Sequence, residues 1–110
     1  MSYEQITIIG HIGSVTPRES KSNTHYLELS VAVSKGSGER RTTKWYQVML
    51  FGEMVRNMDV LLKYFTVGRL IVVEGKPTAE AYLKKDGTAG LRQTIVANSL
   101  PTLLDSQKTS

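Results

Sequence analysis

A single helical stretch interrupts a chain that is otherwise patterned for β-strands. Between residues 53 and 65 the apolar side chains recur at the three- and four-residue spacing of one helix face, at Met54, Val55, Met58, Leu61, Leu62 and Phe65. Gly68 follows as a signal for the helix to end. Because strand side chains alternate at every second residue, this stretch does not fit the sheet that the remaining segments predict.

The flanking segments alternate between apolar and polar residues, as strands with one buried face do. They cover residues 4–11, 25–34, 44–51, 69–77 and 93–99. Gly10 and Gly13 predict a bend or bulge, and Asp86-Gly87 predicts a tight hairpin turn with positive φ angles. Three strands, a helix and two strands are the order of the five-stranded oligonucleotide/oligosaccharide-binding (OB) barrel, an all-β fold with one helix between strands 3 and 4. An unrelated small β-barrel plugged by a helix is the alternative.

The composition is that of an ordinary globular domain. The chain has 110 residues, 40% hydrophobic and 22% charged, which suffices for one modest core. We expect one OB domain over residues 1–104 and a short flexible tail over residues 105–110. No apolar run approaches the ~20 residues of a membrane span. The first residues lack the basic region of a secretory signal, and the lack of cysteine fits a reducing, cytoplasmic location.

No motif for catalysis or metal binding is present in the sequence. There is no GxxxxGK[ST] phosphate loop and no HExxH pair, and without cysteine there are no thiol nucleophiles or cysteine zinc sites. His11 and His25 have no carboxylate at metal-ligand spacing. We therefore expect a binding protein rather than an enzyme, with no cofactor and no metal. The net charge of +4 points weakly to a polyanionic partner.

The segment KWYQVMLFG, residues 44–52, holds the only tryptophan and one of two phenylalanines. On a strand, Trp45 and Phe51 share one face, and the other face carries Tyr46, Val48 and Leu50. Small barrels fill their interior with compact aliphatic side chains, which favours Trp45 and Phe51 on the outside. Exposed aromatic rings suit the stacking of unpaired nucleobases. The opposite arrangement, with both rings in the core, fits the alternation equally well.

The same segment resembles the W-[HY]-x-V-x-L-F-G block of bacterial single-stranded DNA-binding proteins of the SSB type. ITIIGHIG is similar to the first strand and turn of that family, LELSVAVS to its second strand, and LLKYFTVG with LIVVEG to its helix and fourth strand. The resemblance runs in order from Gln5 to Ala97. It implies an OB-fold homo-oligomer, dimer or tetramer, that binds single-stranded DNA with little sequence preference. Replication, recombination or repair would be its setting, in a bacterial cytoplasm or from a plasmid or phage.

The resemblance also implies residue roles. The stacking aromatics of the family fall on Trp45 and Phe51, and a third falls on Tyr82, seven residues after Gly75. An ordinary strand tyrosine is the alternative for Tyr82. Nearby basic residues are expected to neutralise phosphates, namely Lys35, Arg40, Arg41, Lys44, Lys84, Lys85 and Arg92. For the first four, which lie in one polar hairpin, the alternative is a solvated loop that only keeps the protein soluble.

The chain departs from this family in several places. The hairpin over residues 35–43 has no aromatic, Glu53 stands where lysine is common, and basic residues are missing just before Tyr82. Tyr46 stands where histidine is frequent near a subunit contact, so a tetramer does not follow. The acidic tip ending in phenylalanine is missing, so no tail-mediated recruitment of repair proteins is expected. A primosomal-type accessory or adaptor protein, and an interaction subunit without DNA binding, remain alternatives.

The strand predicted over residues 69–77 is apolar on both faces. Ile71 and Val73 point one way, and Leu70 and Val72 point the other. One barrel buries only one of these faces. We therefore expect a partner subunit to cover the other, in a closed symmetric oligomer.

Overall fold

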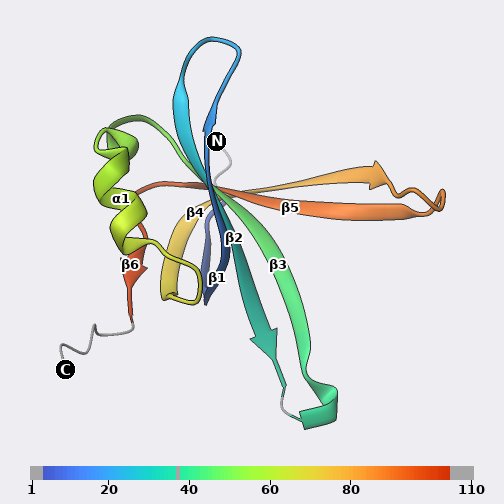
Figure 1. Ribbon diagram of the computed structural model, residues 1–110. Helices are drawn as coiled ribbons and strands as arrows, with labels where there is room; N and C mark the ends of the chain where they lie inside the picture. Colours follow the sequence, from blue (N-terminus) through green and yellow to red (C-terminus); the bar gives the residue numbers. More distant parts are fainter. Residues whose placement is uncertain (1–3, 37, 105–110) are drawn as a thin grey trace.

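The alternating segments pair into a closed barrel in the computed structural model, which describes residues 4–36 and 38–104. Its strands are β1 (Ile6–Glu19), β2 (His25–Lys35), β3 (Thr42–Leu50), β4 (Leu70–Leu83) and β5 (Ala89–Ala97). The hydrogen-bonded order is β1-β2-β3-β5-β4, and β4 also pairs with β1, which closes the ring (Figure 1). β3 and β5 run parallel to each other, whereas the other neighbours are antiparallel. The predicted five-stranded OB barrel is confirmed.

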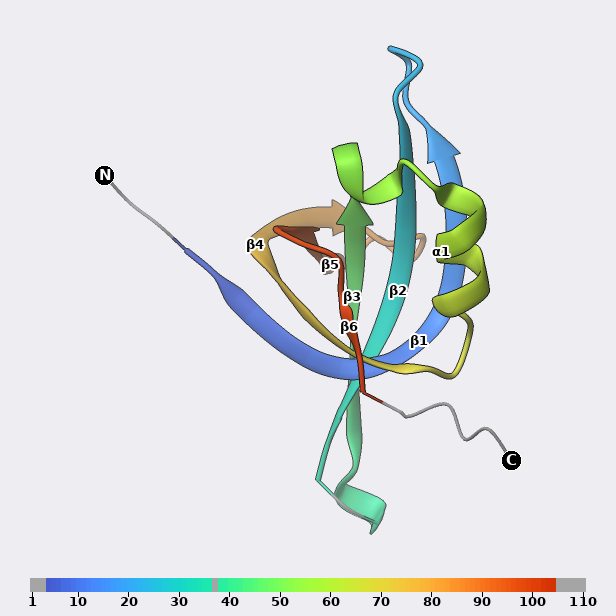
Figure 2. The same cartoon turned by 90° about the vertical axis from the view of Figure 1, so that its left-hand side faces the viewer.

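The helical segment lies between β3 and β4, as predicted, but it is broken. A 3-10 turn, η2 (Gly52–Val55), precedes the helix α1 (Met58–Tyr64), and the backbone of Asn57 (φ −109°, ψ 71°) is not helical. The prediction of one continuous helix over residues 53–65 is therefore wrong. The break still lets both pieces reach the core, because Val55, Leu61 and Phe65 are buried while Leu62 is exposed. Figure 2 shows α1 at one side of the barrel.

Aliphatic side chains fill the barrel. Where the strands form the barrel wall, alternate residues are buried. The fully enclosed side chains include Leu27, Leu29, Val31, Val48, Leu50, Ile71, Val73 and Ile95. On β3 the buried face is that of Tyr46, Val48 and Leu50, whereas Trp45 is 56% exposed. The structure therefore decides between the two arrangements that the alternation left open: Trp45 lies outside the core.

Three strands extend well beyond their predicted bounds, and one strand was missed; β5 begins at Ala89 rather than at residue 93. β1 continues past His11 to Glu19, with a register shift between Ile12 and Ser14 that confirms the bulge predicted there. β4 continues to Leu83 because β5 pairs with it along that length. A short strand, β6 (Thr102–Leu103), pairs with the start of β4. These extensions depend on hydrogen bonds to distant segments, which local alternation does not encode.

The β4–β5 hairpin turns differently from the prediction. Gly87 has a positive φ of 88°, and the Gly87 N–H donates to the Lys84 carbonyl. Asp86 is not among the positive-φ residues of the described chain. Gly87 is thus the one left-handed residue of this turn, and it is the last residue of the loop, whereas the prediction gave positive φ angles to both Asp86 and Gly87. A three-residue hairpin connection with a terminal left-handed glycine has this pattern.

Three hairpins extend from the barrel in different directions (Figure 1). They join β1 to β2, β2 to β3 through the short turn η1 (Gly38–Arg40), and β4 to β5. The tail predicted over residues 105–110 lies outside the described residues. In the described part of the chain, no helix is long and apolar enough to cross a membrane.

Candidate nucleic-acid interface

Trp45 lies against the neighbouring strands with much of its ring uncovered. It sits opposite Ala32 in the β2–β3 register, and its benzo ring crosses to Gly13 of β1. A Cβ atom built on Gly13 would lie 2.5 Å from Trp45 Cζ3, so only glycine leaves room for this ring. The indole is thus placed by β1 and β2 and stays 56% exposed. It is an aromatic surface available for stacking.

Tyr82 is placed in a similar way on the β4–β5 hairpin. Its cross-strand partner is Gly90, and a Cβ built there would lie 2.7 Å from Tyr82 Cζ. The Arg92 guanidinium lies 5.2 Å from the centroid of the Tyr82 ring, within the range of a cation–π contact. Tyr82 is 39% exposed. The ring is therefore positioned by its own hairpin and accessible from outside.

Trp45 and Tyr82 line the same groove. Its volume is about 190 Å³, and its walls also include Ser30, Tyr46, Gln47, Leu91, Arg92 and Gln93. The parallel pairing of β3 with β5, in which Gln47 is opposite Thr94, brings these segments together. Two of the three predicted stacking residues, which are far apart in the sequence, therefore face one space.

Phe51 is not part of this groove. It follows the end of β3 and is only partly exposed. Its ring packs against Tyr26 of β2, with centroids 5.0 Å apart and planes inclined by 31°. Phe51 is on the same face of the strand as Trp45, but one side of its ring is already occupied. Whether bases stack on it remains a prediction.

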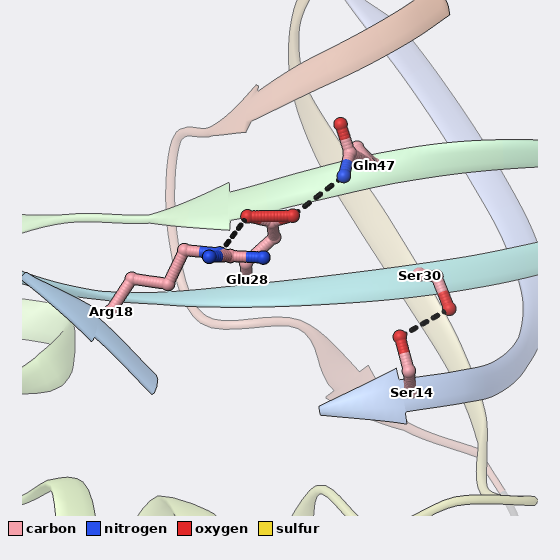
Figure 3. Close-up of polar contacts among 5 residues, drawn as sticks. All are labelled: Ser14, Arg18, Glu28, Ser30 and Gln47. Carbon is pink, nitrogen blue, oxygen red and sulfur yellow. Dashed lines mark hydrogen bonds and ion pairs between the residues drawn. The ribbon is translucent and has the colours of Figure 1, made fainter. Parts of the chain in front are cut away.

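A polar network that the sequence analysis missed lies beside the groove (Figure 3). Arg18 Nε donates to Glu28 Oε1 at 2.6 Å, and Gln47 Nε2 donates to Glu28 Oε2 at 2.6 Å. Nearby, the hydroxyls of Ser14 and Ser30 are 2.7 Å apart. Glu28 and Ser30 alternate with the buried Leu27 and Leu29 and so lie on the outer face of β2. Only the pairing of β1, β2 and β3 shows which residues they meet.

The seven predicted phosphate-binding residues are all exposed, and none forms a salt bridge within residues 4–36 and 38–104. Lys35, Arg40 and Arg41 lie in the β2–β3 hairpin, and Lys84 and Lys85 lie at the β4–β5 tip. Lys44 differs, because its Nζ lies 5.3 Å from the centroid of the Tyr46 ring. By the strand alternation it lies on the face opposite Trp45, against Tyr46, which is itself one of the groove residues. Its contact with phosphates remains a prediction.

Asp86 counteracts some of the positive charge at the β4–β5 tip. Its carboxylate accepts hydrogen bonds from the Thr88 hydroxyl at 2.6 Å and from the Thr88 N–H at 3.0 Å. These bonds stabilise the charged form and lower the pKa of Asp86. The tip thus carries Lys84, Lys85 and an ionised carboxylate that closes the turn.

The described residues contain no group of three His, Cys, Asp or Glu side chains that could hold a metal ion. A second groove, of about 280 Å³, opens near the end of the barrel and is lined mainly by uncharged residues. The arrangement is suited to binding.

Comparison with known proteins gives a consistent result. The model of the single-strand binding protein family matches residues 3–103. The mitochondrial single-stranded DNA-binding protein Rim1 of Saccharomyces cerevisiae is 31% identical over 111 residues, which cover 98% of this chain and 78% of Rim1.

Solved structures agree with these matches. A Rim1 crystal structure has a TM-score of 0.68 at 29% identity and covers 96% of this chain and 99% of its own. A Plasmodium falciparum SSB complex with single-stranded DNA has a TM-score of 0.72 at 18% identity, covering 96% of this chain and 97% of its own. A small single-stranded DNA-binding protein of Streptomyces coelicolor has a TM-score of 0.71 at 16% identity over both full chains. The last two likenesses concern the fold.

Proposed function

The chain belongs to the single-strand binding protein family, and on this premise we propose that it binds single-stranded DNA along the outer face of β3 and β5. It acts as a binding protein and not as an enzyme, in the DNA replication, recombination or repair that such proteins serve. The observation that carries the proposal is the groove that Trp45 and Tyr82 share. Exposing a large indole on a strand sacrifices burial unless a ligand covers it.

Bases would stack on Trp45 and Tyr82, with Phe51 continuing the track along β3. Stacking on aromatic rings tolerates every base, because each base has a π-face. Phosphates would be neutralised by the two basic hairpins and by Arg92, whose exposed charges are unpaired within the described chain. Lys44 would contribute only where the bound DNA passes over the face of β3 that carries Tyr46.

The test is a titration with oligo-dT that follows the fluorescence of Trp45, the only tryptophan. Stacking places a base over the indole, so we expect quenching that saturates as the DNA binds. Repeating the titration at several salt concentrations counts the neutralised phosphates, at about −0.7 in slope for each. Saturated binding with unchanged fluorescence would contradict the stacking role of Trp45.

We also propose that the protein is a homo-oligomer. Ile71 and Val73 are fully buried, whereas the outer face of the same sheet carries Val72 paired with Ile9, which is 54% exposed. Leu104, 45% exposed, adds to this face through its N–H bond to Leu70. A second copy would cover these side chains in a symmetric contact.

Light scattering at micromolar concentration is expected to report at least twice the 12.2 kDa of one chain. Replacing Ile9 with Lys places a charge in the proposed contact and should shift the protein toward the monomer. A wild-type protein that remains at 12.2 kDa would rule the oligomer out.

The cellular location is proposed to be cytoplasmic, as the absence of cysteine suggested. The name of the Rim1 relative places that protein in mitochondria. Fractionation of cells that produce the protein would decide between a cytoplasmic and an organellar pool.

A further inference from the structure

Resting on the proposed function, we propose that the groove between Trp45 and Tyr82 selects one base by its chemistry. It would favour a base with an exocyclic amino group, such as cytosine, over thymine. The selecting atom is Oε1 of Gln47, one of the groove residues. The remaining stacking sites would tolerate any base, so this preference acts at one position within a largely sequence-tolerant site.

The orientation of the Gln47 amide is fixed by chemistry. An ionised carboxylate only accepts hydrogen bonds, so the NH₂ group of Gln47 must face Glu28. The 2.6 Å contact from Gln47 Nε2 to Glu28 Oε2 shows this arrangement. Figure 3 shows the Gln47 oxygen turned away from Glu28. A flipped amide would place two acceptors in contact.

Arg18 holds the Glu28 carboxylate in place. Its Nε donates to Glu28 Oε1 at 2.6 Å, so both carboxylate oxygens have donors from the protein. The Glu28 side chain is 15% exposed, whereas that of Arg18 is 50% exposed. The pair places opposite charges side by side, which reduces the repulsion that a lone carboxylate would exert on DNA phosphates. Arg18 and Glu28 are therefore positioning residues for the Gln47 amide.

Gln47 Oε1 is an acceptor that no protein donor reaches among the residues that the structure describes. Cytosine N4 and adenine N6 carry donor hydrogens, whereas thymine has the acceptor O4 in the position of cytosine N4. A base that stacks on Trp45, two residues before Gln47 on the same face of β3, would present its edge near this oxygen. The amino group of cytosine would donate a hydrogen bond to Gln47 Oε1. With thymine, the acceptor O4 would face the acceptor Oε1, and no hydrogen bond could form.

The test measures the affinities for oligo-dC and oligo-dT in the wild type and in Gln47→Met. Methionine keeps the length of the side chain and removes the acceptor. We expect the dC/dT affinity ratio to fall by about fivefold in the variant, the typical net effect of one hydrogen bond. The fall should come mainly from weaker dC binding, and dT binding should not weaken, because the acceptor that opposes thymine O4 is removed. The wild type and the variant are measured with the same two oligomers. Any difference in flexibility between dC and dT therefore affects both ratios equally and cancels when the two ratios are compared.

A control variant and a control ligand sharpen the result. Gln93→Met makes the same chemical change in the same groove but leaves the Glu28 network intact, so the ratio should stay at the wild-type value. An oligomer of 2-pyrimidinone, which is cytosine without its amino group, should bind the wild type and Gln47→Met with equal affinity. Glu28→Gln should lower the ratio as well, because a neutral amide no longer fixes the Gln47 orientation.

Two outcomes would overturn the inference. One is an unchanged dC/dT ratio in Gln47→Met, and the other is a selective loss of dT binding, which would mean that Gln47 acts through its N–H. In both cases dT binding by the wild type would still support the proposed function. Loss of all DNA binding in the wild type would instead refute the proposed function itself.

Discussion

Replacing Trp45 with alanine is expected to weaken binding to oligo-dT by ~1–3 kcal/mol, the contribution of one base stacked on an aromatic ring. The fold should remain intact, because the indole is 56% exposed and lies on the outside of the barrel. Arg92, Tyr82 and the basic hairpins would remain in place, so binding should be reduced rather than abolished. The salt dependence should change little, since stacking releases no counterions.

Anisotropy of a labelled oligo-dT measures the affinity without depending on the tryptophan that the variant lacks. Urea unfolding followed by circular dichroism measures stability in the same preparation. A loss of ~3–5 kcal/mol in the free energy of unfolding is the value for a core aromatic residue. Such a loss, with unchanged affinity for DNA, would show that Trp45 is a structural residue.

Leu50→Ala is expected to have the opposite effect. Leu50 lies on the same strand as Trp45, but its side chain is fully buried in the barrel core. Removing it should lower the free energy of unfolding by ~2–5 kcal/mol, through lost transfer energy and the cavity left behind. Since single domains are stable by only about 5–15 kcal/mol, this loss is a large share of the total.

Urea unfolding of Leu50→Ala beside the wild type checks this prediction, with Trp45→Ala as the matched surface variant. At temperatures where Leu50→Ala is still folded, its affinity for oligo-dT should be close to that of the wild type. A Leu50 variant that lost DNA binding while keeping full stability would contradict the assignment of the inner and outer faces of β3.

Local sequence patterns determined much of this protein. The two-residue alternation predicted the cores of the five barrel strands, and the three- and four-residue spacing predicted a helical segment between the third and fourth. Gly10 and Gly13 marked the bulge in β1. The order of these elements identified the OB barrel, and KWYQVMLFG pointed to the strand that carries Trp45. Each of these features depends on residues that are close together in the chain.

Tertiary structure alone decided the inner and outer faces of β3. Both Trp45 and Val48 suit a core, so alternation left two arrangements, and the closed barrel selects the compact aliphatic face. The structure also divides the helical segment at Asn57 into η2 and α1, and it adds β6. These outcomes depend on how distant segments compete for the same interior space.

The composition of the candidate site was likewise set by strand pairing. Pairing of β3 with β5 brings Tyr82 and Arg92 to the groove of Trp45, whereas Phe51 packs on Tyr26. The contacts of Glu28 with Arg18 and Gln47 join three strands, and no spacing in the sequence encodes them. A strand pattern specifies which side a residue faces. The register between strands, which is fixed by backbone hydrogen bonds across the whole barrel, specifies which residues it meets.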